Sequence, residues 1–299
     1  MSNCVLSLCI PTNGMLEWVE LVVESIYNQD ADLEKYEVVI TDNGNNELFR
    51  KKMMQYEKKY SNFVYKKTNA FQFLNQIEAF RLAKGDLIKF VNHRMLVKDG
   101  AIQYLIDFAE EHTNEKPGIF FPNGNLKLKE EYIKCKTFDE YVGKLSYWSS
   151  WSGGLACWKS DFSKIPLETK YNELFPHTDI LFFEKNKQKY IVDNKEILEE
   201  IPVGHESKGK YNLFYAFSVE YLLVISRLLE SKDIGIRTFL KIKEDNKRFL
   251  EDLYWQFIIR KKECSYNLEH YREYLNCYYK HENIRWGAYK SGVMHLIKR

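Results

Sequence analysis

Three short polar segments, residues 11–14, 42–45 and 92–94, each follow directly after a run of apolar residues. The first segment offers backbone N–H and C=O groups, and the second begins with Asp42, a carboxylate that can accept hydrogen bonds from a ring N–H. The third reads Asn-His-Arg and contributes Arg94, a permanent cation suited to paired bonds with anionic oxygens. Together these residue types could hold a ligand that combines a flat heterocycle with negative charge.

The apolar runs before these segments are rich in strand-forming residues, and helical periodicity separates them through residue 91. Strands are expected at residues 4–10, 36–41, 63–65 and 87–91. Three helices are expected: one near 16–26, a charged one that ends at about Tyr60, and one from 71 to 84. On the first, helical spacing places on one face Trp18, Leu21, Val22, Ser25 and Ile26. Such alternation predicts an α/β fold in which helices cover a parallel sheet. The three polar segments should then meet along one rim, where such sheets bind ligands.

Beyond residue 98 the pattern becomes mixed and then helical. We expect a helix at 98–112, a strand at 118–121, a glycine-containing strand at 153–158 and a helix near 177–187. Four further helices are predicted near residues 212–231, 238–260, 266–280 and 283–297. The sequence therefore predicts an α/β domain at residues 1–205 and a helical region at 206–299, with the boundary near 205–211.

The composition excludes several classes of protein. Forty-four basic and 42 acidic residues leave a formal net charge of +2, which gives no electrostatic signal for binding nucleic acid. The six cysteines form no Cys-x-x-Cys pair, so buried thiols fit better than disulfides or zinc ligands. No leader pattern opens the chain and no apolar run approaches about 20 residues. We therefore expect a cytoplasmic protein, at the inner face of a membrane if it contacts one.

Four motifs in order resemble the family-2 glycosyltransferases of the GT-A fold. They read LSLCIPTN at 6–13, SIYNQ at 25–29, EVVITDNG at 37–44 and AKGDLIKF at 83–90. The position of Asn75, ten residues before Gly85, resembles the pattern of the abequosyltransferase-like branch of this family, which works on O-antigen and capsule sugars. The resemblance implies a Rossmann-like mixed sheet, a nucleotide-sugar donor and a saccharide or lipid-linked saccharide acceptor.

The resemblance also assigns nucleotide binding to the first two polar segments. The residues implied are Pro11, Thr12, Asn13, Asp42, Asn43 and Asn75. Asp42 would pair with the donor edge of the base, but the same Asp-Asn-Gly pattern is also typical of an ordinary turn. Both interpretations stand at this point.

The family's metal-binding aspartates are replaced here by Asn92, His93 and Arg94. A hard cation on a diphosphate prefers carboxylate oxygens, so a divalent ion (manganese or magnesium) is not required by this pattern. His93 and His205 are the candidate ligands if an ion binds. Without an ion, Arg94, helped by Lys208, would stabilise the departing diphosphate. Two alternatives remain: the site has lost its activity and the protein only binds its ligand, or these residues are ordinary solvent-exposed loop residues.

The resemblance places a general base at the start of a helix that follows the glycine-containing strand. Asp179 occupies this position, although Thr178 stands where the family pattern has Glu. An acidic residue that merely favours the helix N-terminus is the alternative, and Asp139 is a weaker candidate for the base. Gly153 and Gly154 would let a donor sugar approach the backbone closely.

The end of the chain is basic and amphipathic. Trp286, Val293, Leu296 and Ile297 could form one face, which suits docking on an anionic membrane or packing on the preceding helices, and homo-oligomers are compatible with it. The resemblance thus predicts an inverting glycosyltransferase of bacterial surface-polysaccharide synthesis. The alternatives are a binding-only relative and a nucleotidyltransferase. The latter normally has a glycine-rich loop where this chain has Pro-Thr-Asn-Gly at 11–14.

Overall fold

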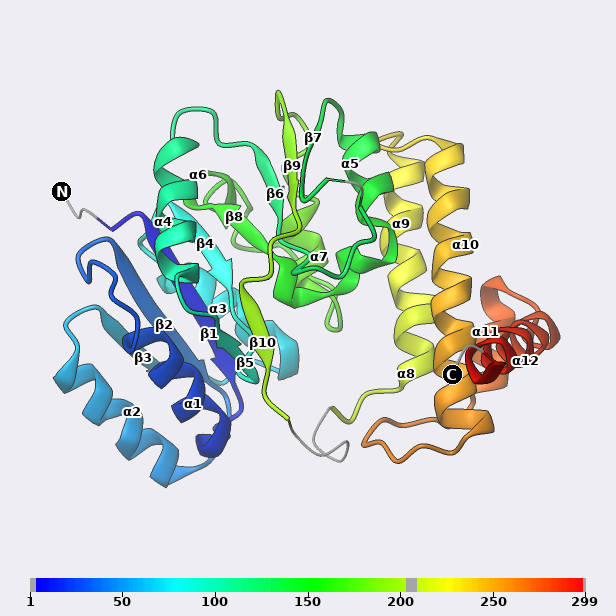
Figure 1. Cartoon of the computed structure of the whole chain (residues 1–299), viewed down its shortest axis with the longest axis horizontal. Coiled ribbons are helices and arrows are strands. Elements are labelled where there is room, and N and C mark those ends of the chain that lie inside the picture. Colours follow the sequence, from blue (N-terminus) through cyan, green and yellow to red (C-terminus); the bar gives the residue numbers. More distant parts are fainter. Residues whose placement is uncertain (1–3, 129, 203–208, 298–299) are drawn as a thin grey trace. The chain divides into compact units, whose positions relative to one another are not determined.

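The computed structural model describes residues 4–128, 130–202 and 209–297, with side chains described through Gly292 (Figure 1). It divides into two compact units. The first consists of Met1–Tyr141 and Trp148–Ile201, and the second of Val142–Tyr147 and Pro202–Arg299. The sequence predicted a single boundary near 205–211; the units instead divide at Ile201, and the helical unit also includes Val142–Tyr147.

A five-stranded mixed sheet forms the centre of the first unit, with the strand order β3-β2-β1-β4-β8. Its strands are β1 (Leu6–Thr12), β2 (Tyr36–Asp42), β3 (Phe63–Lys67), β4 (Leu87–Phe90) and β8 (Ala156–Trp158). The first four are parallel, while β8 pairs with β4 in the antiparallel sense. The predicted mixed sheet is confirmed, and its four parallel strands are those that the apolar runs indicated.

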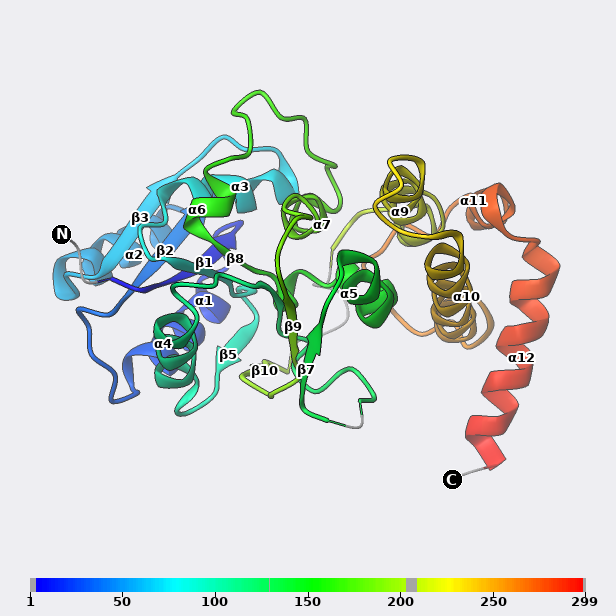
Figure 2. The same ribbon diagram turned by 90° about the horizontal axis from the view of Figure 1, so that it is seen from above.

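Helices cover both faces of this sheet, and for that reason its strands read as continuous apolar runs. The helices are α1 (Leu16–Tyr27), α2 (Glu47–Lys59), α3 (Asn75–Leu82) and α4 (Ala101–Glu111). Figure 2 shows α1 and α4 on one face and α3 on the other. On α1 the buried side chains are Trp18, Val19, Val22, Val23 and Ile26, whereas Leu21, on the edge of that face, is 45% exposed.

Two further sheets and several short helices complete the described part of this unit. Strands β5 (Met95–Val97) and β10 (Leu198–Glu200) pair antiparallel, and β9 lies between β6 and β7. The remaining bounds are β6 (Gly118–Phe120), β7 (Tyr132–Cys135), β9 (Tyr190–Asp193), α6 (Lys159–Phe162) and α7 (Pro176–Leu181). Helix α5 (Phe138–Leu145) begins in this unit, and its residues from Val142 belong to the second.

Several predicted elements were too long, and one was of the wrong type. The predicted strand at 153–158 begins as a 3₁₀ turn, Ser152–Gly154, and only Ala156–Trp158 extends as a strand. The predicted helix at 177–187 is only α7, and the helix expected from 98 starts after Gly100, whose φ of +72° is left-handed. The strand and the helix expected from 98 thus begin late, after the 3₁₀ turn and after Gly100, whereas α7 ends early, at Leu181.

The second unit is built from helices, as predicted. They are α8 (Leu213–Tyr215), which continues through a π-helical turn (Ala216–Glu220) into α9 (Tyr221–Glu230), then α10 (Ile236–Leu253) with a π-helical end (Tyr254–Ile259), α11 (Tyr271–Tyr278) and α12 (His281–Ile297). Their buried cluster contains Leu213, Phe214, Leu250, Leu253, Tyr254, Leu275, Ile284 and Ala288. Within the described ranges, no helix combines the length and apolar character needed to cross a bilayer.

Candidate functional site

The carboxyl ends of β1, β2 and β4 bring the three polar segments together. Thr12 pairs with Asp42 in the parallel register, and the backbone N–H of Asn43 donates to Thr12 O at 3.1 Å. From the end of β4, His93 Nδ1 lies 2.9 Å from Thr12 Oγ1. We call this edge, formed by Thr12, Asp42 and residues 92–94, the carboxyl rim.

Asp42 is buried in the carboxyl rim and is already hydrogen-bonded by the protein. Its Oδ1 accepts from Gly44 N at 2.7 Å and its Oδ2 accepts from the Tyr65 hydroxyl at 3.1 Å. Burial raises the pKa of the Asp42 carboxyl, while these two bonds act in the opposite direction. The turn role of Asp42 is therefore present, and its contact with a base stays a prediction that uses the remaining lone pairs of the two oxygens.

Asn75 is a buried hub beneath the same rim. Its Nδ2 donates to Thr12 O at 3.0 Å and to Thr41 O at 2.8 Å, while its Oδ1 accepts from Thr68 Oγ1 at 2.7 Å. One amide thus joins the ends of β1 and β2 to the loop after β3. Because these bonds occupy most of its capacity, Asn75 fixes the rim, and direct contact with a nucleotide stays a prediction.

The loop after β3 adds an exposed aromatic ring that the sequence analysis missed. Asn43 Nδ2 donates to Ala70 O at 2.9 Å and to Gln72 O at 3.1 Å, so it holds the two neighbours of Phe71. The Phe71 side chain is 56% exposed, and Gln72 has a left-handed φ of +41°. In the sequence these residues look like the start of a helix, and only the strained turn shows that Phe71 faces solvent. Asn13 is also exposed.

Arg94 presents a buried, unsatisfied hydrogen-bond donor at the rim. Its Nη1 is buried and has no hydrogen-bond partner among the described residues. Its guanidinium lies 6.0 Å from the ring of Trp18, and the edge of His93 packs on the same ring at 5.2 Å. Burial, together with the charge of Arg94, lowers the pKa of His93 to about 3, so this imidazole is neutral at physiological pH.

The residues at 92–94 do not fit a divalent ion. Asn92 Oδ1 accepts from Arg94 N at 3.1 Å, and His93 Nδ1 is engaged with Thr12. The guanidinium of Arg94 adds a positive charge beside any ion placed there. In the described part of the chain, no group of three or more His, Cys, Asp and Glu side chains could hold a metal. His205 and Lys208 lie outside the described residues.

Gly153 and Gly154 lie in the buried 3₁₀ turn before β8. An added Cβ would lie 2.4 Å from Trp151 Cζ2 at Gly153 and 2.1 Å from Phe120 Cζ at Gly154. The physical reason for these glycines is therefore the close approach of the protein's own rings, and a 3₁₀ turn replaces the first part of the strand that the sequence predicted. Their contact with the donor sugar stays a prediction.

Asp179 lies in the first turn of α7 and is half-buried. Its Oδ2 accepts from Asn172 N at 2.6 Å. Its two predecessors anchor the helix, because Thr178 Oγ1 donates to Ser149 O at 3.0 Å and His177 Nε2 donates to Ser150 O at 2.7 Å. Burial lowers the pKa of His177 to about 4, which keeps this imidazole neutral. Thr178, which departs from the family pattern, thus has a structural role.

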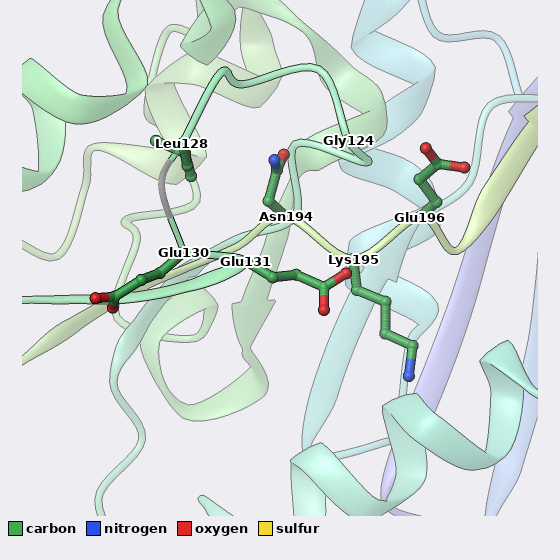
Figure 3. A pocket seen from close by; sticks show the side chains of 7 residues that line it. All are labelled: Gly124, Leu128, Glu130, Glu131, Asn194, Lys195 and Glu196. Carbon is green, nitrogen blue, oxygen red and sulfur yellow. The ribbon is translucent and has the colours of Figure 1, made fainter.

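A different cavity, of about 500 Å³, opens beside β9 (Figure 3). It is lined by Gly124, Leu128, Glu130, Glu131, Asn194, Lys195 and Glu196. Lys98 pairs with Glu196 at 2.6 Å, and the Asn194 side chain bonds the backbone of Leu126. This cavity contains no predicted site residue, and its acidic lining does not suit a diphosphate. The carboxyl rim is therefore the better candidate site.

Comparison with known proteins bears on the family and the fold of the chain. Residues 7–175, more than half of the chain, match the family model "Glycosyl transferase family 2". Solved structures of Staphylococcus aureus TarS 1–349 share the fold at 16% identity: the complex with UDP-GlcNAc has a TM-score of 0.57 over 75% of this chain and 66% of that one. The complex with UDP has a TM-score of 0.56 over 85% and 72%.

The structure of TarS 1–349 alone gives a TM-score of 0.54, and the match spans 65% of its length. No curated protein sequence matches this chain. At such low identity these neighbours establish the fold, which is the expected GT-A-like arrangement of a parallel-rich sheet and helices. The match to the family model over more than half of the chain shows that the chain belongs to glycosyl transferase family 2.

Proposed function

We propose that the protein is an inverting glycosyltransferase that moves a sugar from a nucleoside-diphosphate donor to a saccharide or lipid-linked saccharide hydroxyl. The observation that carries this proposal is the buried, unpartnered Arg94 Nη1 at the carboxyl rim of a family 2 chain. TarS 1–349, which shares the fold, has been solved with UDP-GlcNAc, and this supports a nucleotide-sugar donor. A role in bacterial surface-polysaccharide synthesis, in the abequosyltransferase-like branch, is the finer part of the proposal.

In this mechanism the base of the donor lies against residues 11–13 and Asp42. The exposed ring of Phe71, held in place by Asn43, offers a surface on which a base can stack. The diphosphate then lies toward residues 92–94. This order follows the rim from β2 through β1 to β4.

Arg94 replaces the metal ion as the electrostatic clamp. A guanidinium held in a partly buried place needs no reorganisation when negative charge develops on the leaving diphosphate. Its unsatisfied Nη1 gains a partner at that moment, which favours the transition state over the free enzyme.

The chemical step is a single displacement at the anomeric carbon. The acceptor oxygen attacks that carbon, its proton passes to the carboxylate of Asp179, and the bond to the diphosphate oxygen breaks with its electron pair. Attack opposite the leaving group inverts the anomeric configuration. Gly153 and Gly154 contribute the backbone that faces the donor sugar.

Membrane contact belongs to the same proposal. On α12, Ile284 and Ala288 pack into the helical core, whereas Trp286 is 72% exposed and Tyr289 40% exposed. An exposed tryptophan beside basic residues suits peripheral binding to an anionic membrane that carries lipid-linked acceptors. The predicted partners of Trp286 from Val293 onward lie beyond the described side chains.

A binding-only relative is the second candidate. The absence of carboxylates at 92–94 favours it, because the family's usual metal ligands are missing there. Purified protein that binds nucleotide-sugars but neither transfers nor hydrolyses them would establish this alternative.

The test combines a donor screen with one substitution. A panel of nucleotide-sugars is assayed for thermal stabilisation and for donor turnover, with chelator and with added manganese. We expect turnover to survive the chelator, and Arg94→Ala to lower turnover about 10²–10³-fold, as loss of a charge-stabilising donor does.

Arg81→Ala is the matched control, because Arg81 is exposed on α3, where it pairs with Glu78 and donates to Leu167 O. It should retain normal turnover. A strict requirement for manganese or magnesium would contradict the role of Arg94.

A further inference from the structure

The residues between 149 and 155 are held by side chains from other elements as well as by their own turn. Locally, Gly154 N donates to Trp151 O at 3.2 Å and Leu155 N donates to Ser152 O at 3.0 Å. The carbonyl groups of Ser149, Ser150 and Gly153 instead accept from side chains. The carbonyl groups of Gly154 and Leu155 accept from the backbone N–H groups of Phe121 and Phe90, at 2.9 and 3.1 Å. Buried backbone groups need such partners, so side chains and backbone bonds together position the segment.

Lys89 supplies the bond at Gly153 and is the most unusual of these partners. It lies on β4, its side chain is fully buried, and its Nζ donates to Gly153 O at 2.5 Å. The same Nζ lies 2.8 Å from Phe90 O and 3.4 Å from Leu155 O. These three carbonyl oxygens give each of the three N–H donors of the Lys89 ammonium group an acceptor. The ring of Phe121 lies 5.8 Å away.

A buried lysine is costly, since the charged form loses its hydration. A leucine or methionine at this central strand position would avoid that cost and would pack in the same space. Lys89 therefore needs an account beyond packing, and its bonds give one. They join β4, which leads through Val91 to residues 92–94, to the turn that contains Gly153 and Gly154.

We propose that Lys89 is a positioning residue that fixes the 149–155 segment relative to the carboxyl rim. This inference rests on the proposed function, in which Arg94 and the two glycines face different ends of one donor. Lys89 then helps to set the distance between the diphosphate clamp and the backbone facing the sugar, beside the backbone bond from Phe90 N to Leu155 O. From the other direction, Thr178 and His177 tie the same segment to α7, which contains Asp179.

Lys89→Met tests the proposal because methionine fills a similar volume without a donor. A misplacement of about 1 Å can cost about 10²-fold in rate, so we expect kcat for transfer to fall at least about 10-fold. Affinity for UDP and for GDP, measured by calorimetry, should stay within about twofold, because the base contacts lie on β1 and β2. Hydrogen exchange should accelerate in residues 149–155 and not in β1.

Two further variants complete the design. Lys89→Gln retains a donor to one carbonyl and should fall between wild type and Lys89→Met in both kcat and exchange. Lys159→Met is the control, since Lys159 is a nearby half-buried lysine whose Nζ lies 3.5 Å from Phe80 O, away from the segment. It should leave kcat and exchange unchanged.

The outcomes separate this inference from the proposed function. A wild-type protein inactive on every donor contradicts the glycosyltransferase function, and the exchange data still decide whether Lys89 holds the segment. Normal kcat and normal exchange in Lys89→Met would overturn the inference. So would loss of folding in both Lys89 variants, because Lys89 would then support the whole sheet rather than this segment.

Discussion

The carboxyl rim and the 149–155 segment both contain predicted site residues, but different kinds of bonds hold them. At the rim, parallel strands end in register, and the Asn75 amide joins two neighbouring strand ends. The 149–155 segment is followed by only three residues of regular strand, and the side chains of Lys89, His177 and Thr178 hold the carbonyl groups of Gly153, Ser150 and Ser149. Backbone N–H groups bond the carbonyl groups of Gly154 and Leu155.

The difference teaches where substitutions should act. Rim geometry follows from the strand ladder, so changes to its base-binding residues should act mainly on ligand affinity, whereas Arg94 should act on turnover through the leaving diphosphate. The 149–155 segment depends on single side chains distant in sequence, so changes there should act on turnover. The predictions below follow this division.

The largest effect is expected at Asp179. As a general base, Asp179 should contribute about 10²–10⁴-fold in rate, so Asp179→Asn should lower kcat by that order. Asparagine keeps an Oδ atom that can accept from Asn172 N, which preserves the local structure. UDP affinity should not change.

Steady-state kinetics of transfer and calorimetry with UDP check this prediction. The control is Glu173→Gln, which changes an exposed acidic residue of the loop before α7 and should retain full activity. If Asp179→Asn turns over normally, the base lies elsewhere, and Asp139 is the next residue to test.

A smaller effect is expected at Asp42, on affinity. Asp42→Ala should weaken nucleotide binding by about 1–3 kcal/mol if a donor of the base loses a buried acceptor. Calorimetry with UDP and GDP measures this, and Asp86→Ala, an exposed residue just before β4, is the control. If Asp42→Ala lowers thermal stability but leaves nucleotide affinity unchanged, Asp42 stabilises the turn and does not bind the base.

The smallest effect is a pH dependence of stability that originates at Lys89. Burial lowers the pKa of Lys89 from 10.5 to about 7, so between these values the unfolded chain binds the extra proton. Stability should therefore rise with pH across this window, and the burial penalty is fully present below it.

Thermal unfolding of wild type and Lys89→Met between pH 7 and about 10 isolates this effect, because other groups contribute equally to both proteins. The stability gap between the two should change in favour of wild type as pH rises. A gap that does not depend on pH would contradict a titrating, buried Lys89.

The sequence alone predicted the parallel strands, the helices between them and the meeting of Thr12, Asp42 and His93 at one edge. It could do so because apolar runs and strand order are local or nearly local properties, and parallel strands necessarily end at a common edge. The family assignment, carried by motifs that lie within these same elements, was confirmed by the match over residues 7–175.

Only the tertiary structure revealed the 3₁₀ turn at Gly153, the exposed ring of Phe71 and the bonds of Lys89. Lys89 looks in the sequence like an interruption of an apolar strand, since two of its three acceptors lie 64 and 66 residues further along the chain. Glycines 153 and 154 indicated space, but the rings that fill it come from Trp151 and Phe120. Contacts between residues distant in sequence are specified by packing and by the need to satisfy buried polar groups, and neither leaves a periodic pattern in the chain.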